Sequence, residues 1–291
     1  DVAFVHWATS IAPGDHSVFV ATTGGQLDFA LVANLTADPT QSSLAAADLS
    51  GDGVLDLVVF QTVDNFPRAF LGTSSGPGDI SFALAPYAAA SGRIVTSPVS
   101  RMVLTPDLDG SPGADAIYLS LDNTELGWIS YSSGEPVATP LVSVTAPAVL
   151  RIALRYAFIT TEPTLADING DGLDDLLYVL LADGLQGELV ARPRTAAPPT
   201  VAFGAPLTLT TRVAAFFLLD LDSDASPELL TTVGRVYTLW RINSDATLAR
   251  IGHIDSTRID LPFHVGLADL DHNGLVDIVF NYNVPGGALR L

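Results

Sequence analysis

Short apolar runs recur along the chain, and five of them follow acidic segments. These five runs read LDLVVF, ADAIYLSL, DDLLYVLL, PELLTTV and VDIVFNY. They are rich in β-branched and aromatic residues, and each is long enough for a strand and short for a helix. The pattern predicts an all-β protein whose strands are largely buried.

The same pattern gives approximate positions for the strands. We expect strands near residues 2–7, 17–22 and 27–33, and then near 44–49, 55–62, 67–72 and 80–86. Further groups of strands are expected over about residues 100–145, 160–207 and 213–253, with a last group from residue 263. Residues 146–160 make a longer connection, for which the sequence allows an extra strand or a short helix.

Each of the five apolar runs is preceded by a loop with a fixed pattern of oxygen-bearing side chains. Counted from the first acid, these side chains stand at positions 1, 3, 5 and 9. They are Asp48, Ser50, Asp52 and Asp56; Asp107, Asp109, Ser111 and Asp115; Asp167, Asn169, Asp171 and Asp175; Asp220, Asp222, Asp224 and Glu228; and Asp269, Asp271, Asn273 and Asp277. The residues at position 7, which would contribute backbone carbonyls, are Val54, Gly113, Leu173, Ser226 and Leu275.

Oxygen atoms at alternate positions of a tight loop can converge on one hard cation. The pattern therefore predicts up to five structural Ca²⁺ ions, and the alternative is an acidic turn without metal. Position 6 is glycine in three of the loops, which permits a sharp turn. Pro112 and Ala225 stand there in the loops at Asp107 and Asp220, so the occupancy of these two loops stays open.

The residues around the loops exclude the helix-loop-helix class of calcium-binding protein. That class needs a bidentate Glu at position 12 of the loop. The residues found there are Val59, Tyr118, Tyr178, Thr231 and Phe280. The metal is instead expected between two strands, because a strand-like run follows each loop at once.

The spacing of the loops indicates a repeat protein. Successive loops begin 49 to 60 residues apart, which leaves room for about four short strands per repeat. All-β repeats of this size favour a single β-propeller domain over residues 1–291, with about six or seven four-stranded antiparallel blades. Asp1 aligns with the ninth position of a further loop, so we expect incomplete terminal blades and a chain that is part of a longer one.

The loop sequence Asp-x-Asp/Asn-Gly-Asp-Gly-x-x-Asp-Leu at this spacing resembles the FG-GAP and VCBS type repeat of integrin α-chain heads and of many secreted proteins. Phe203-Gly204-Ala205-Pro206 is similar to the Phe-Gly and Gly-Ala-Pro elements of that family. The resemblance covers nearly the whole chain. It implies a calcium-stabilised β-propeller outside the cell, and it does not specify a ligand.

Composition agrees with a secreted, metal-bearing protein. The chain has no cysteine, so metal rather than disulfide bonds would cross-link it. The formal net charge is −19, yet half of the 32 acidic residues are loop carboxylates. No basic stripe is present that would favour nucleic acid, and the apolar runs are too short to insert into a membrane.

The sequence contains one match to a catalytic motif, and the residues that follow it do not fit the motif. Gly72 to Gly76 reads GTSSG and matches the serine-hydrolase pattern, but a further strand is expected after it in place of the required helix. Trp128 and Trp240 are expected to pack on third strands. We therefore expect a non-enzymatic extracellular or cell-surface scaffold for protein or glycan, and membership of a larger assembly stays open. The alternatives are the propeller of a polysaccharide lyase and a shell segment of a secreted toxin assembly.

Overall fold

The computed structural model describes residues 2–6, 15–23, 27–36, 42–61, 66–76, 79–87, 93–95, 99–105, 107–122, 124–131, 135–143, 149–150, 163–181, 187–222, 224, 226–255, 264–270, 272 and 276–281. The chain divides into two compact units, residues 1–143 and residues 144–291. Each unit is built from antiparallel sheets.

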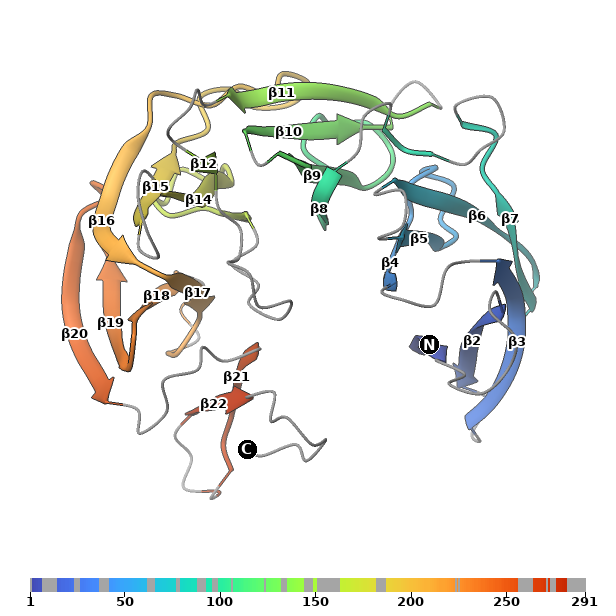
Figure 1. The fold of residues 1–291 in the computed structure, drawn as a ribbon. Helices are drawn as coiled ribbons and strands as arrows, with labels where there is room; N and C mark the ends of the chain where they lie inside the picture. Colours follow the sequence, from blue (N-terminus) through green and yellow to red (C-terminus); the bar gives the residue numbers. More distant parts are fainter. Residues whose placement is uncertain are drawn as a thin grey trace. The chain divides into compact units, whose positions relative to one another are not determined.

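The first unit contains three sheets in its described residues, and strands that follow one another in sequence lie side by side (Figure 1). The first sheet has β1 (Val2–His6), β2 (Asp15–Thr23) and β3 (Leu27–Thr36). The second has β4 (Ser42–Ala47), β5 (Asp56–Gln61), β6 (Pro67–Gly76) and β7 (Asp79–Leu84). The third has β8 (Val99–Thr105), β9 (Asp115–Ser120), β10 (Glu125–Ser130) and β11 (Val137–Ser143).

The described residues of the second unit also form three sheets. One has β12 (Val149–Leu150), β13 (Thr164–Ala166), β14 (Asp175–Leu181), β15 (Gly187–Arg192) and β16 (Leu207–Val213). The next has β17 (Ala215–Leu219), β18 (Glu228–Val233), β19 (Val236–Ile242) and β20 (Leu248–Asp255). The last has β21 (His264–Ala268) and β22 (Asp277–Asn281).

The longer connection contains an extra strand. β12 pairs with the far end of β14, where Val149 lies opposite Leu181, and β13 pairs with the near end of the same strand. An extra strand is one of the two possibilities that the sequence left open at residues 146–160. Residues 151–162 of this connection lie outside the described residues.

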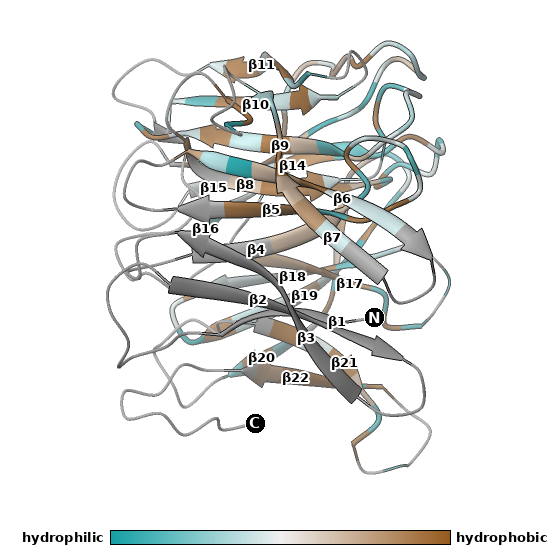
Figure 2. Ribbon diagram, turned by 90° about the vertical axis from the view of Figure 1, so that its right-hand side faces the viewer, coloured by the Kyte–Doolittle hydropathy of each residue, from teal (hydrophilic) through white to brown (hydrophobic). Residues whose placement is uncertain are grey.

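β5, β9, β14 and β18, each of which follows an acidic loop, are buried on both of their faces over most of their described residues. In β18, Leu229 belongs to a core cluster that includes Leu177 and Val179 of β14, whereas its neighbour Leu230 belongs to a cluster with Val265 of β21. Because successive side chains point to opposite faces of a strand, the two clusters lie on opposite sides of β18. This arrangement explains why these strands read as continuous apolar runs, as the brown colour of β5 also shows (Figure 2).

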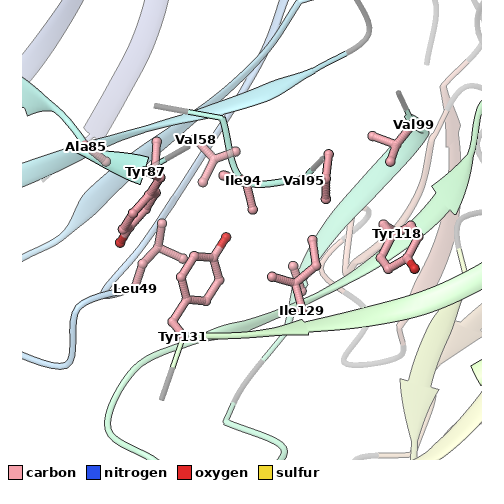
Figure 3. Close-up of a cluster of buried hydrophobic side chains, with 12 residues drawn as sticks. Leu49, Val58, Ala85, Tyr87, Ile94, Val95, Val99, Tyr118, Ile129 and Tyr131 are labelled. Carbon is pink, nitrogen blue, oxygen red and sulfur yellow. The ribbon is translucent and has the colours of Figure 1, made fainter. Parts of the chain in front are cut away.

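One core cluster of the first unit lies between the sheet β4–β7 and the sheet β8–β11. Figure 3 shows Leu49 beside Tyr87 and Tyr131, with Val58 and Ile129 in the same cluster. Leu49 is the second residue of an acidic loop, so this loop is anchored in the core by its own side chain. At about 25 cal/mol per Å² of apolar surface, burial of a leucine contributes roughly 2 kcal/mol.

The all-β prediction is confirmed, and several four-stranded antiparallel sheets are of the kind found in propeller blades. Trp240 lies on a third strand and packs in a core cluster, where its Nε1 donates a 2.8 Å hydrogen bond to Thr231 Oγ1. Within the described residues, we find no helix with the length and apolar character needed to span a bilayer.

Candidate metal centre

Each of the five acidic loops connects two strands that follow one another in sequence and pair in the same sheet. They join β4 to β5, β8 to β9, β13 to β14, β17 to β18 and β21 to β22. The loops at Asp48, Asp107 and Asp167 are described in full. Ser223 and Ala225 of the loop at Asp220, and the predicted ligands Asp271, Asn273 and Leu275 of the loop at Asp269, lie outside the described residues.

The acid at position 9 makes the same hydrogen bond in all five loops. One of its oxygens accepts the backbone N–H of the residue at position 2, which closes the loop across its base. The bonds run from Leu49 to Asp56 (2.8 Å), Leu108 to Asp115 (2.7 Å), Ile168 to Asp175 (3.3 Å), Leu221 to Glu228 (3.0 Å) and Leu270 to Asp277 (2.9 Å). This shared contact gives the last acid of each loop a structural role that the sequence pattern did not reveal.

In two loops the second oxygen of this acid is also bound by backbone. Asp56 Oδ1 accepts a hydrogen bond from Gly72 N, and Asp175 Oδ1 accepts one from Arg194 N, both at 2.7 Å. Each of these carboxylates therefore ties its loop to the third strand or the residues just after it. Desolvation by burial raises the pKa of Asp56 and of Asp175, and the hydrogen bonds from backbone work in the opposite direction.

The loop at Asp107 differs from these two in the hydrogen bonding of the second oxygen of its last acid. Asp115 is buried, and its Oδ1 has no hydrogen-bond partner among the described residues. Oxygens of Asp107, Asp109 and Asp115 all lie within 4.8 Å of one another. Desolvation by burial, together with the charges of Asp109 and Asp107, raises the pKa of Asp115 to about 6. An orphaned, buried carboxylate oxygen beside two further acids fits a hard divalent cation.

Asp109 is fixed in place by hydroxyl and amide donors. Ser130 Oγ donates a 2.6 Å hydrogen bond to Asp109 Oδ2, and Ser111 N donates to Asp109 Oδ1 at 2.9 Å. Desolvation by burial alone would raise the pKa of Asp109, but the hydrogen bonds from Ser111 and Ser130 outweigh it and lower the pKa. Asp109 is thus a pre-oriented anion, which is what a metal ligand requires.

Pro112 does not prevent the turn of this loop. Gly113, one residue later, has a φ of +116°, a conformation open to glycine and costly for other residues. The Pro-Gly pair therefore provides the sharp turn at position 7, where the loops at Asp48 and Asp167 use Gly53 and Gly172 at position 6 with φ of +85° and +83°. The departure at position 6 is compensated within the same loop.

In the loops at Asp48 and Asp167 the first acid organises the turn through backbone donors. Asp48 accepts hydrogen bonds from the N–H groups of Gly51, Asp52 and Gly53 at 2.7, 3.1 and 2.7 Å. The first acid of the other loop makes the equivalent bonds, from Gly170, Asp171 and Gly172 to Asp167. These two loops are fully described, and no three of their carboxylates lie within 4.8 Å of one another. Their acids are engaged with backbone donors.

The acid at position 5 fixes the residue that the sequence predicts as a carbonyl ligand. Asp52 Oδ1 accepts from Val54 N at 2.8 Å, and Asp171 Oδ1 accepts from Leu173 N at 2.9 Å. In the fourth loop Asp224 Oδ1 accepts from Ser226 N at 2.7 Å. Coordination by the position 7 carbonyls stays a prediction.

The fourth loop is the one in which all four predicted side-chain ligand positions are acidic. Oxygens of Asp220, Asp222 and Asp224 lie within 4.8 Å of one another, and all three residues are exposed. An arginine approaches this loop: Arg241 Nη2 lies 3.5 Å from Asp222 Oδ2, and Arg241 Nε lies 3.9 Å from Glu228 Oε1.

The segment that matches the serine-hydrolase pattern lies within a strand. Gly72 to Gly76 are the last residues of β6, which pairs with β7 through contacts such as Gly72 opposite Phe82. A nucleophile of that class needs a strand, a sharp turn and then a helix. The position of GTSSG in the middle of a sheet does not provide that geometry.

Comparisons with known proteins find solved structures of similar fold, but they do not assign the chain to a family. No family model matches the sequence. No curated protein matches it either. Among solved structures, a lectin from Agrocybe aegerita that specifically recognises non-reducing terminal N-acetylglucosamine aligns over 100% of this chain and 78% of its own, with 14% identity and a TM-score of 0.56.

Two weaker alignments also cover most of the chain. A protein from Lactobacillus plantarum aligns over 99% of this chain and 80% of its own, with 11% identity and a TM-score of 0.48. The V. cholerae biofilm matrix protein Bap1 aligns over 96% of this chain and 73% of its own, with 9% identity and a TM-score of 0.37. The similarity to the Agrocybe lectin, at 14% identity, concerns the fold and is consistent with a propeller-like arrangement of β-sheets.

Proposed function

We propose that this chain is an extracellular β-propeller of the FG-GAP and VCBS type, stabilised by calcium in its acidic loops. In this proposal the propeller is a non-enzymatic scaffold, and its surface binds a glycan or protein partner. The observation that carries the metal part is the loop at Asp107, where a buried carboxylate oxygen beside two further acids has no hydrogen-bond partner among the described residues.

Asp107, Asp109 and Asp115 would hold the ion in that loop, and the calcium would supply positive charge between β8 and β9. Without such a charge, three carboxylates whose oxygens lie within 4.8 Å repel one another, and one of them is desolvated. An ion that binds the folded loop and not the unfolded chain stabilises the fold by mass action. Calcium is plentiful outside cells, so an extracellular location suits a fold that depends on it.

A glycan is the ligand to test first. One solved structure with a similar fold is a lectin that recognises non-reducing terminal N-acetylglucosamine. Fold similarity of this kind favours glycan as the class of ligand and does not identify the binding residues. A protein ligand is the second candidate.

A binding assay separates these roles. The purified chain would be applied to a glycan array in calcium and again after calcium is stripped, with Asp109→Asn as the variant of the best-formed loop. We expect saturable glycan binding without turnover, weaker when the metal is removed. Cleavage of an applied uronic-acid polymer would overturn the non-enzymatic role, and failure to bind any glycan while capturing a protein ligand would favour the second candidate.

A further inference from the structure

The fourth loop combines several negative charges with one acid whose side chain is buried. At positions 1, 3, 5 and 9 it carries Asp220, Asp222, Asp224 and Glu228, one acid more than any other loop has at these four positions. The side chain of Glu228 is only 4% exposed. A buried carboxylate needs hydrogen bonds and a nearby positive charge to offset the loss of hydration.

Leu221 N provides the hydrogen bond to Glu228, at 3.0 Å, and Arg241 provides the charge. Arg241 lies on β19, the third strand of the same sheet. Its guanidinium reaches Asp222 at 3.5 Å and Glu228 at 3.9 Å, so it lies between two residues that the sequence pattern assigns to a metal. Two of the predicted metal ligands of this loop therefore already face a cation that is part of the chain.

In the three other acidic-loop sheets whose third strand is described, the equivalent position carries no charge. Arg241 follows Trp240, which lies opposite Leu229, the residue after Glu228. In the other sheets, the residue that follows the last loop acid also has a partner on the next strand, and the position after that partner corresponds to Arg241. The residues at this position are Leu71 on β6, Ser130 on β10 and Pro193 after β15. Among the four sheets that have both an acidic loop and a described third strand, only the one with the fourth loop has an arginine at this register position.

We propose that Arg241 is the built-in cation of the fourth loop and makes this repeat independent of calcium. The inference rests on the proposed function, because it takes calcium binding by the other loops as the reference. The guanidinium is always charged and presents several donors in a fixed plane, which suits a site with two acids. A divalent ion at this loop has to compete with a positive charge that is tethered beside its ligands.

The test compares Arg241→Gln with Arg250→Gln in the full chain. Arg250 is an exposed residue of the neighbouring strand β20, so its replacement is a matched loss of one positive charge. Calcium binding to the unmodified chain and to both variants would be measured by titration calorimetry, and thermal unfolding would be followed with calcium and with EDTA.

We expect Arg241→Gln to bind one more calcium ion than the unmodified chain, or to bind its weakest ion about tenfold more tightly, because a repelling charge near 4 Å is removed. In EDTA this variant should melt below Arg250→Gln, and calcium should restore the difference. Equal calcium binding by the two variants, with no calcium rescue specific to Arg241→Gln, would overturn the inference. If the unmodified chain binds no calcium at all, the proposed function fails instead, and the two failures are distinguishable.

Discussion

Asp56 Oδ1 accepts a 2.7 Å hydrogen bond from the backbone N–H of Gly72, 16 residues farther along the chain. The other oxygen of Asp56 accepts from Leu49 N at 2.8 Å and Ser50 N at 3.0 Å. This buried carboxylate therefore serves three backbone donors, and it links the acidic loop to the third strand of the sheet. It contributes to the fold whether or not a metal is bound.

Replacing Asp56 with asparagine should destabilise the protein even without calcium. The amide keeps one acceptor oxygen and turns an N–H₂ group toward a backbone donor, so at least one buried N–H loses its partner. We expect a loss of about 3 kcal/mol in the free energy of unfolding, measured by urea unfolding in EDTA. Asp52→Asn is the control: Asp52 is exposed and accepts from Val54 N, so its loss in EDTA should stay below about 1 kcal/mol. Equal losses for the two variants would contradict the structural role of Asp56.

Gly113→Ala should destabilise the protein more than Gly172→Ala, which places alanine at the exposed turn of another acidic loop. The loops at Asp48 and Asp107 touch through their backbones, because Ala114 N donates a 2.7 Å hydrogen bond to Asp48 O. A Cβ at Gly113 would lie 2.6 Å from Leu49 O, at a residue whose φ is +116°. We expect a loss of about 3 kcal/mol or more, from strain and overpacking together.

Gly172→Ala provides the matched control for that substitution. Gly172 also has a positive φ, of +83°, but an added Cβ would meet nothing within 4 Å among the described residues. Its cost should be limited to backbone strain of about 1–2 kcal/mol. Thermal unfolding of both variants checks the difference, and a Gly113→Ala protein no less stable than Gly172→Ala would show that the two loops do not interlock as described.

Stability should fall at high pH through Tyr118. Its hydroxyl donates a 2.8 Å hydrogen bond to Glu125 Oε1, and desolvation by burial, followed by this bond and the charge of Glu125, raises the pKa of Tyr118 above its usual 10. The folded state thus keeps the phenol neutral where the unfolded chain ionises it. This contribution is complete below about pH 10 and is lost as the pH rises further.

Tyr118→Phe tests this pH dependence. The variant lacks the ionisable group, so its free energy of unfolding should fall less steeply than that of the unmodified chain between roughly pH 9 and pH 11. Urea unfolding at several pH values measures both slopes. Parallel pH profiles would show that Tyr118 titrates alike in the folded and unfolded states.

The sequence predicted the strands and the placement of the acidic loops, because strand periodicity and loop composition are local properties. The sequence analysis assigned the sharp turn to glycine at position 6, whereas the structure shows that the residue at position 4 also has a left-handed backbone conformation. Gly51, Gly110 and Gly170 have φ between +72° and +79° there, and His272 has a φ of +59° at the same position. The repeated glycine at position 4 was the available signal.

Contacts between strands could not be predicted in the same way. The partner of Asp56 is a backbone N–H on β6, and the approach of Arg241 to Glu228 depends on the register of β18 and β19. Register is set by the turn geometry and packing of the whole sheet. The unpartnered oxygen of Asp115 likewise depends on burial between strands, which no local pattern encodes.

The most direct test of the calcium account is thermal unfolding of the full chain, first with millimolar calcium and then with excess EDTA. The account predicts a higher melting temperature in calcium, since an ion present at 100 times its dissociation constant stabilises the fold by about 2.7 kcal/mol per site. Asp109→Asn, which alters the loop with the orphaned oxygen of Asp115, should lose part of that gain. A melting temperature that is the same in calcium and in EDTA would contradict the account.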